Sequence, residues 1–311
     1  MRLQVSPLLL LVLALLPGCS GRSSRREETA RLVRDGLGRT VVLQGDPRRI
    51  VSLAPNVTES LFALGLGGRL VGVSDFCELP EGTGTIARVG GMLNPNLEVI
   101  RALRPDLLIA TTSGNDPAFA SQAAVLGLPL YTLHATDVNA TIESLRELAG
   151  ALGERPRGDA LAAALRSRLE EVHRRLMGRR SPRVLFIVWG EPLVVPGGPA
   201  FLTDALERAG GNSVTRGAPA AWPALDLESA IAGAPEVILT TEPNRGMAEA
   251  LPGDPAWALV PAARRRRVYV VSGAIERPGP GVVRGIEEVA RLLHPRAFES
   301  DGAPRGTPES E

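Results

Sequence analysis

The feature that most constrains the fold is a short pattern that occurs twice, 130 residues apart. In the first half, Asn96-Leu97-Glu98 is followed by RPDLLIAT at 104–111; in the second, Asp226-Leu227-Glu228 is followed by APEVILTT at 234–241. Self-similarity at one constant offset is typical of a duplicated unit. Coincidence is the alternative, because strands that begin with Pro and an acid are common in α/β proteins. We expect two lobes of the same local construction.

Strands and helices alternate through short loops in both halves. We expect strands at 49–53, 70–74, 107–111, 130–133, 183–189, 237–241 and 267–271. We expect helices at 98–103, 118–126, 141–152, 200–209, 227–231 and 282–293, and one more whose loop and first turn occupy 54–59 and which continues to 64. This alternation predicts parallel sheets covered by helices, so the fold class is α/β with two Rossmann-like lobes.

A long amphipathic segment, Asp159–Met177, separates the two halves. Its apolar positions, spaced by three or four residues, share one face of a helix. Asp159 could cap the helix start, and Gly178 with Pro182 marks the end. Taken alone it could be an ordinary surface helix, but its place between the repeats predicts one long interlobe connector.

The amino terminus predicts export and a lipid anchor. An apolar run from Leu8 to Leu16 is too short to span a bilayer and is typical of a signal-peptide core. Leu16-Pro17-Gly18-Cys19 resembles a bacterial lipobox, so we expect lipidation at Cys19. Cys77 would then have no intrachain partner, and we expect it to act as a small apolar residue.

These boundaries divide the chain of 311 residues. We expect a signal peptide at 1–18, a tether and N-terminal hairpin at 19–46, an N-terminal lobe at 47–153, a connecting helix at 154–180, a C-terminal lobe at 181–296 and a disordered tail at 297–311. The formal net charge of +1 provides no basic footprint for nucleic acid.

Catalytic and metal-binding patterns are weak. A nucleophilic enzyme needs a Ser, Thr or Cys near a His and an orienting acid, and no spacing here supports one. No His-x-x-x-His or Cys-x-x-Cys motif is present, so we expect no metal site. The remote enzymatic alternative is a secreted α/β enzyme with His134 or Glu276 as its general base.

Binding residues are expected in the loops that follow the strands, because ligands of open α/β sheets lie beyond the carboxyl ends of the strands. Trp189 and Trp222 offer rigid aromatic faces there, with core packing as the alternative. Glu276-Arg277 could form an internal ion pair or a polar anchor. Glu98 and Glu228 hold the same place in each repeat. They either complement a helix dipole or form matched docking charges for a partner bearing arginines.

Several segments closely resemble the helical-backbone substrate-binding proteins of ABC importers, nearest to the cobalamin-binding branch. They are RIVSLAPNVTE at 49–59, LVGVSD at 70–75, VGG at 89–91, NLE at 96–98 and RPDLLIA at 104–110, continued by Trp222-Pro223 and Glu276-Arg277. The resemblance implies two lobes on one rigid helix, a ligand held between them and modest closure on binding.

The same resemblance implies the roles of individual residues. Phe76 and Trp222 stand at ligand-contacting aromatic positions, Glu276 and Arg277 line the cleft, and Glu98 and Glu228 face arginines of the permease dimer. Thr111, Gly273 and Gly90-Gly91 depart from the cobalamin pattern, which leaves haem or a ferric siderophore as alternative ligands. The full set of expected ligand-binding residues is Pro55, Asn56, Phe76, Thr111, Trp189, Trp222, Glu276 and Arg277.

The sequence therefore predicts a binding protein that performs no covalent chemistry. We expect an extracytoplasmic monomer, lipid-anchored through Cys19, that needs no cofactor. It would capture cobalamin or a related corrinoid and deliver it to an ABC permease dimer with its ATPase.

Overall fold

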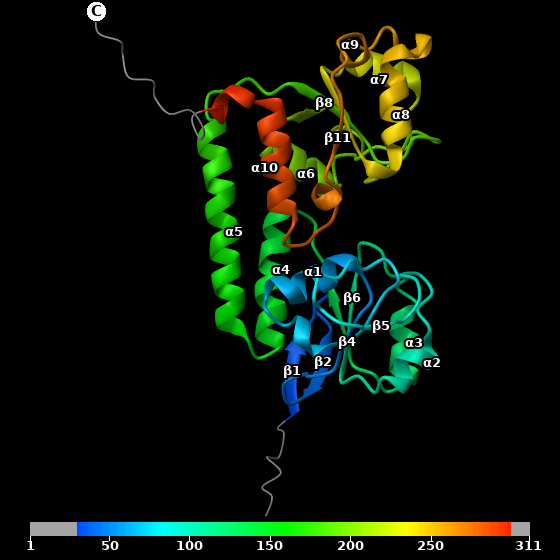
Figure 1. Ribbon diagram of the computed structural model, residues 1–311, viewed down its shortest axis with the longest axis vertical. Coiled ribbons are helices and arrows are strands. Elements are labelled where there is room, and N and C mark those ends of the chain that lie inside the picture. The colour runs from blue at the N-terminus through cyan, green and yellow to red at the C-terminus, as the bar shows by residue number, and fades with distance from the viewer. Residues whose placement is uncertain (1–29, 300–311) are drawn as a thin grey trace, which may run out of the picture.

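The computed structural model describes residues 30–299 and consists of two lobes stacked along its longest axis (Figure 1). Two long helices, α4 (Val138–Ala151) and α5 (Arg155–Leu176), run side by side along the lobes. The predicted signal peptide, Cys19 and residues 300–311 lie outside the described residues.

The N-terminal lobe contains a parallel sheet of five strands in the order β5-β4-β3-β6-β7. Its strands are β3 (Ile50–Ser52), β4 (Leu70–Val73), β5 (Ala87–Arg88), β6 (Leu107–Thr111) and β7 (Leu130–Leu133). Its helices are α1 (Pro55–Ala63), α2 (Leu97–Ala102) and α3 (Phe119–Val125). One face of the sheet packs against α1 and the end of α4, and the other against α2 and α3.

The C-terminal lobe repeats this arrangement with a parallel sheet in the order β11-β10-β8-β9. Its strands are β8 (Arg183–Ile187), β9 (Asn212–Ser213), β10 (Val237–Thr241) and β11 (Val268–Val271). Its helices are α6 (Phe201–Arg208), α7 (Leu227–Gly233), α8 (Arg245–Ala250), α9 (Pro261–Arg264) and α10 (Val282–Leu293). The fold class predicted from the sequence is confirmed.

An antiparallel hairpin precedes the first lobe, as the sequence predicts. It pairs β1 (Ala30–Arg34) with β2 (Thr40–Gln44). The buried carboxylate of Asp35 accepts hydrogen bonds from the backbone N–H groups of Leu37 and Arg39, which fixes the turn. Val41 and Leu43 face the N-terminal core, while Leu32 and Val42 face outward.

The repeat seen in the sequence is also a repeat of backbone geometry. Arg104 and Ala234, 130 residues apart, both adopt the left-handed conformation, with φ of 47° and 43°, which is uncommon for residues other than glycine. In each lobe an arginine at the start of the first strand stabilises that turn. The Nε atom of Arg49 donates to the carbonyl of Arg104 (3.1 Å), and the Nε atom of Arg183 donates to that of Ala234 (2.9 Å). The two lobes therefore share one construction.

The long helix begins earlier than the sequence suggests, so the assignment of Asp159 as its N-cap is wrong. Helix α5 starts at Arg155, directly after α4, with Pro156 in its first turn, where proline costs no hydrogen bond. Its end is as expected, because Gly178 adopts a left-handed conformation with φ of 72°.

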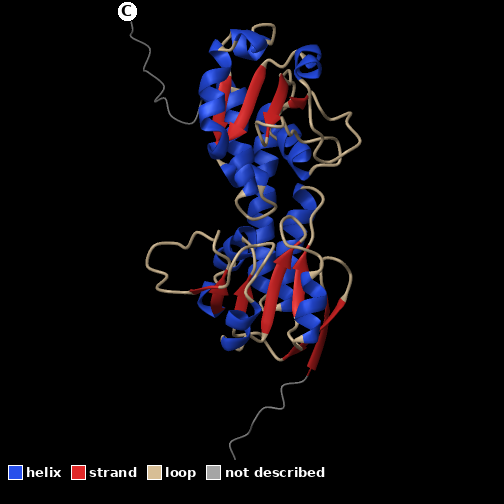
Figure 2. Ribbon diagram, turned by 90° about the vertical axis from the view of Figure 1, so that its right-hand side faces the viewer, coloured by secondary structure: helices blue, strands red, loops and turns tan. Residues whose placement is uncertain are grey.

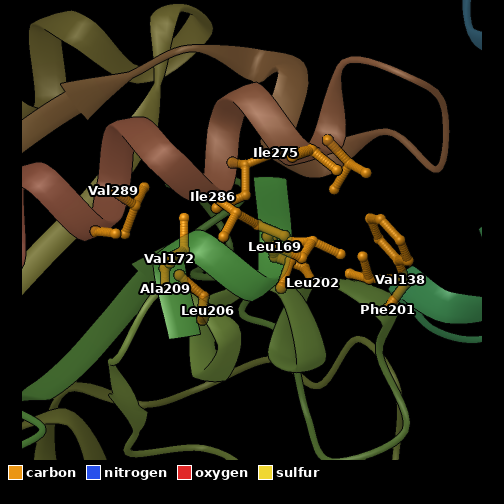
Figure 3. Close-up of a cluster of buried hydrophobic side chains, with 14 of the residues drawn as sticks. Val138, Leu169, Val172, Phe201, Leu202, Leu206, Ala209, Ile275, Ile286 and Val289 are labelled. Carbon is orange, nitrogen blue, oxygen red and sulfur yellow. The ribbon is translucent and has the colours of Figure 1, made fainter. Parts of the chain in front are cut away.

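Helix α5 is one half of a helix pair. The first half of α4, with Val138 and Ile142, belongs to the core of the C-terminal lobe, whereas Leu148 and Leu152 belong to that of the N-terminal lobe. The apolar face of α5 packs between α6 and α10 of the C-terminal lobe, as Figure 3 shows for Leu169 and Val172.

The sequence analysis missed several short elements: α8, α9, β5 and β9. Five 3₁₀ turns that it also missed are η1 (Gly67–Arg69), η2 (Glu242–Asn244), η3 (Leu251–Gly253), η4 (Pro255–Trp257) and η6 (Pro295–Ala297). The tail expected from residue 297 also starts too early, because Phe298 packs on the C-terminal core beneath the guanidinium groups of Arg175 and Arg291.

Candidate functional site

The carboxyl ends of the strands in the two lobes face each other. Figure 2 shows the arrowheads of both sheets directed toward the region where the lobes meet. The loops that follow β3, β4 and β6 therefore meet those that follow β8, β10 and β11. We call the surface formed by these loops the interlobe face. It is where a ligand of a parallel α/β fold is expected.

Each lobe holds its strand ends with a buried asparagine that the sequence analysis missed. In the N-terminal lobe, the Nδ2 atom of Asn115 donates to the carbonyls of Leu53 (2.9 Å) and Met92 (2.8 Å), and its Oδ1 atom accepts from the N–H of Thr111. In the C-terminal lobe, Nδ2 of Asn244 donates to the carbonyl of Val188 (2.9 Å). The one available signal was an asparagine three or four residues after each repeated strand.

Three predicted aromatic residues, two in these loops and Trp222 in the segment between β9 and α7, have much of their surface exposed. Phe76 follows β4 and is 65% exposed, Trp189 follows β8 and is 56% exposed, and Trp222 is 50% exposed. Core packing, the alternative for both tryptophans, is therefore excluded in this structure. Large exposed aromatic side chains are typical of binding surfaces.

The loop that carries Trp222 is ordered by backbone pairing. Residues 193–197 run antiparallel to residues 221–225, with hydrogen bonds such as Val195 N–H to the carbonyl of Pro223 (3.1 Å) and Gly197 N–H to that of Ala221 (2.8 Å). Trp189 joins this ladder through reciprocal bonds with Val194. Both tryptophans are thus held on one extended platform of the C-terminal lobe.

Two other predicted ligand contacts, Asn56 and Thr111, are buried. The Nδ2 atom of Asn56 donates to Oγ1 of Thr111 (3.3 Å) within the N-terminal lobe and to the carbonyl of Pro278 (3.0 Å) in the C-terminal lobe. Pro55 is half-buried at the first turn of α1, beside Asn56. In this structure Asn56 and Thr111 help to join the lobes.

Glu276 and Arg277 lie at the end of the 3₁₀ turn η5 (Gly273–Glu276), directly after β11. Arg277 is exposed, and its Nη2 atom donates to Oε1 of Glu59 on α1 (3.2 Å), which forms an ion pair between the lobes. Glu276 is half-buried, and burial raises the pKa of its carboxyl group; a hydrogen bond with Thr241 and the charge of Arg277 oppose this shift. A hollow of about 350 Å³ beside the ion pair is lined by both lobes, including Phe62 of the first and Arg284 of the second.

Glu98 and Glu228 occupy matching surface positions. Each is exposed in the first turn of its helix, α2 or α7. The helix starts are capped by other side chains, because Asn96 accepts from the N–H of Glu98 and Asp226 accepts from that of Ser229. Capping leaves both glutamate carboxylates available to a partner.

Cys77 and His134 have local partners. Cys77 is buried in the N-terminal core, and the hydroxyl of Thr58 donates to its Sγ atom at 3.1 Å. His134 is exposed after β7, with Nδ1 at 2.9 Å from Oγ1 of Thr112. Within residues 30–299, no group of three or more His, Cys, Asp or Glu side chains is placed to hold a metal ion.

Two lobes with facing strand ends, joined by a pair of packed helices and bearing exposed aromatic residues where they meet, define the class of two-lobed ligand-binding proteins. The family described as periplasmic binding protein matches residues 50–274. The chain therefore belongs to the periplasmic binding protein family, and it is a substrate-binding protein of an ABC transporter and not an enzyme.

Relatives and solved structures agree with this assignment. The ABC transporter substrate-binding lipoprotein YvrC of Bacillus subtilis is 26% identical over 94% of this chain and 96% of its own length. A vitamin B12-binding protein of Vibrio parahaemolyticus is 27% identical, covering 78% of this chain and 87% of the relative. The haem-binding protein RhuT of a Roseiflexus species superposes with a TM-score of 0.71 at 26% identity, covering 80% of this chain and 99% of that structure.

The family also fixes the compartment at a coarse level, since its members act in the periplasm or elsewhere outside the cytoplasm. No helix among residues 30–299 is both long and apolar enough to cross a bilayer. The resemblance to helical-backbone substrate-binding proteins is confirmed, while the individual ligand contacts, the docking glutamates and the lipidated cysteine remain predictions.

Proposed function

We propose that this protein captures cobalamin or a related corrinoid at the interlobe face and delivers it to its permease. In this proposal the protein works as a monomer held to the membrane by a lipid on Cys19. Glu98 and Glu228 form the two contacts with the permease dimer. Support for the ligand comes from the vitamin B12-binding relatives and from the chemistry of the exposed side chains.

The observation that carries the proposal is the presence of exposed aromatic faces on both lobes. Phe76 projects from the N-terminal lobe, and Trp189 and Trp222 from the platform of the C-terminal lobe. A macrocycle has two flat, largely apolar faces, and indole and phenyl rings contact such faces with little loss of side-chain entropy. A small hydrophilic anion would gain nothing from these rings.

Haem is the second candidate, because haem-binding proteins of the same family are 25–26% identical to this chain. Haem iron requires an axial ligand from the protein, usually His, Tyr, Met or Cys. Tyr131 is buried in the N-terminal core, and burial raises the pKa of its phenol, so it cannot serve. His134 is exposed after β7, and it is the histidine best placed to act. A corrinoid carries its own equatorial ligands and lower axial base, and therefore makes no such demand.

Calorimetric titration of the purified chain with cyanocobalamin and with haemin separates these ligands. We expect cyanocobalamin to bind with a Kd of about 1 μM or tighter, equivalent to about −8 kcal/mol. The variants Phe76→Ala and Trp222→Ala should each raise the Kd about 10-fold. Val125→Ala, which alters an exposed apolar residue on α3, is the matched control and should leave the Kd unchanged.

The contrary results are distinct for each ligand. No heat with any corrinoid, together with haemin binding that shifts its absorption spectrum and depends on His134, would replace corrinoid by haem. Binding of a ferric siderophore alone would move the assignment to that alternative. Turnover of any of these ligands would contradict the assignment as a binding protein.

The docking role of the two glutamates has its own test. The test measures ATP hydrolysis in vesicles that contain the permease and its ATPase. The double variant Glu98→Lys, Glu228→Lys should reduce this hydrolysis to the level seen without binding protein, because two positive side chains would then face the arginines of the permease. Its Kd for ligand should stay unchanged. Reversal of two other exposed glutamates, Glu170 and Glu249, is the control. A loss of ligand affinity in the docking variant would contradict the docking role.

A further inference from the structure

Several segments that the binding function does not use lie together at one end of the N-terminal sheet, the end that faces away from the C-terminal lobe. Because the sheet is parallel, the residues before β3, before β6 and before β7 lie together at the amino ends of the strands. Figure 1 places the open end of the β1–β2 hairpin at this end of the molecule, away from the C-terminal lobe, while its turn packs against Thr132 in β7. We call this region the outer pole.

The outer pole has an excess of positive charge. Arg48, Arg101 and Arg104 are exposed, and none of their guanidinium groups pairs with a carboxylate within residues 30–299. A fourth arginine, Arg49, donates its guanidinium hydrogen bonds to the carbonyls of Leu103 and Arg104 and not to a carboxylate. The carboxylate of Asp106 faces these groups and accepts the backbone N–H groups of Arg48 and Arg49. Four cations against one carboxylate leave the surface cationic.

Exposed apolar side chains lie beside these charges. Leu32 and Val42 are cross-strand partners on the outer side of the hairpin, 72% and 46% exposed. Val125, at the end of α3, is 87% exposed. A hollow of about 340 Å³ separates the hairpin from the loop before β7 and is lined by Val42, Leu128 and Pro129. Apolar side chains next to arginines are typical of surfaces that bind the headgroup region of a bilayer.

The chain enters the fold at this same pole. Ala30, the first residue of β1, pairs with Gln44, which is four residues from Arg48. Cys19 lies 11 residues before Ala30. Eleven residues span at most about 40 Å even when fully extended, so a lipid on Cys19 would hold the outer pole within that distance of the membrane.

We infer that the outer pole of the N-terminal lobe rests on an anionic lipid surface through Arg48, Arg101 and Arg104 and the apolar pair Leu32–Val42. The inference rests on the proposed lipid anchor at Cys19. Its chemistry is electrostatic attraction to lipid phosphates plus shallow insertion of apolar side chains. A basic side chain at such a surface contributes roughly a factor of five in affinity. The contact would orient the receptor on the membrane before it reaches the permease.

The C-terminal lobe supplies a matched control. Arg264, Arg265 and Arg266 are exposed, lack carboxylate partners within residues 30–299, and lie beside Leu259, which is 70% exposed. This cluster has similar chemistry but lies in the other lobe, away from the tether. If proximity to the anchor decides orientation, only the outer pole of the N-terminal lobe should contact lipid.

The test uses the full-length lipidated chain in vesicles made of equal parts phosphatidylcholine and phosphatidylglycerol. A fluorophore is attached to the new cysteine of the Leu32→Cys variant or, as the control, of the Leu259→Cys variant. Nitroxide groups on the lipid headgroups quench a fluorophore that touches the membrane. Cys77 is buried and stays unlabelled. We expect quenching at position 32 and none at 259. The triple change Arg48→Gln, Arg101→Gln, Arg104→Gln should lower the ratio of anchored chains whose outer pole contacts lipid to those whose outer pole does not by about 100-fold. It should therefore abolish the quenching. The same triple change at Arg264–Arg266 should have no effect.

The opposing results are equally specific. Equal quenching at both positions, or quenching that survives the triple change and roughly 1 M salt, which shortens the screening length to about 3 Å, would overturn the inference. Flotation of the vesicles reports separately on the anchor. If the chain fails to float and Cys19→Ser changes nothing, the proposed lipid anchor is wrong; if it floats without quenching at position 32, only the lipid-facing pole is wrong.

Discussion

At the scale of single residues, Glu276 is the group whose chemistry the fold alters most clearly on the interlobe face. Its carboxyl lies half-buried directly after β11, and burial raises its pKa because the charged form loses hydration. The hydrogen bond with Thr241 and the positive charge of Arg277 counteract only part of this effect. Glu276 is therefore a group whose ionisation lowers the stability of the fold.

The sign of the resulting pH dependence follows from linkage. Between the ordinary pKa and the raised one, the folded chain holds more protons than the unfolded chain, so stability falls as pH rises through this window. Glu276→Gln removes the ionisation and can still accept a hydrogen bond. We expect its free energy of unfolding to exceed that of the wild type at pH 7 and to match it near pH 4, as measured by urea denaturation at both values. A variant less stable than wild type at pH 7 would contradict the burial argument.

Single-residue roles were the hardest to obtain from the sequence. The strand-following positions of Phe76 and Trp189 could be predicted, because each comes directly after a predicted strand, whereas Trp222 was named from its aromatic character and the family resemblance. The bridging role of Asn56 and the clamps of Asn115 and Asn244 could not, because each depends on a carbonyl more than 50 residues away in the chain or in the other lobe. Local patterns carry no information about such partners.

At the scale of elements, the apolar strands and long helices were predictable, and their ends less so. The strand at 107–111 and the helix at 282–293 match the structure residue for residue, because polar residues, Gly or Pro follow or precede their apolar runs directly or within two residues. The start of α5 was misplaced because Arg155-Pro156-Arg157-Gly158 lacks helical patterning, although a proline can occupy a first turn. The short helices α8 and α9 carry too few residues to show a period.

The packing of α5 gives a direct test of its role. Leu165 is 3% exposed and lies in the core of the C-terminal lobe. Leu165→Ala should lower the free energy of unfolding by about 3 kcal/mol, because it removes buried methyl groups and leaves a cavity. Ser167→Ala, on the exposed side of the same helix, should change it by about 0.5 kcal/mol or less. Equal effects in chemical denaturation would mean that α5 is not docked on the C-terminal lobe.

At the scale of the whole molecule, the relative placement of the lobes depends on buried helices more than on the ion pair between them. Helix α4 contributes buried side chains to both cores and α5 to that of the C-terminal lobe, whereas Arg277 and Glu59 are partly exposed and joined by one contact of 3.2 Å. Exposed ion pairs contribute about 1 kcal/mol or less. The sequence indicated a connector but not that two helices share the role.

Small-angle scattering can measure this rigidity. We expect the scattering curves of the chain without and with ligand to coincide at low angle. Coinciding curves would mean that the lobes move only slightly on binding. Arg277→Gln combined with Glu59→Gln should leave both curves unchanged, because the helix pair remains. A large change in the radius of gyration of the wild type on ligand binding would contradict a rigid placement of the lobes. A change seen only in the double variant would show that the ion pair limits the motion.

Helix α4 has one further consequence, for how the protein unfolds. Val138 and Ile142 complete the core of one lobe, while Leu148 and Leu152 complete that of the other. Neither lobe can lose its structure without exposing apolar side chains of a helix that the other lobe also needs. Two lobes linked by an exposed hinge would melt independently, but a helix divided between two cores couples them thermodynamically. We therefore expect the two lobes to unfold as a single cooperative unit, so that damage to either lobe lowers the melting temperature of both.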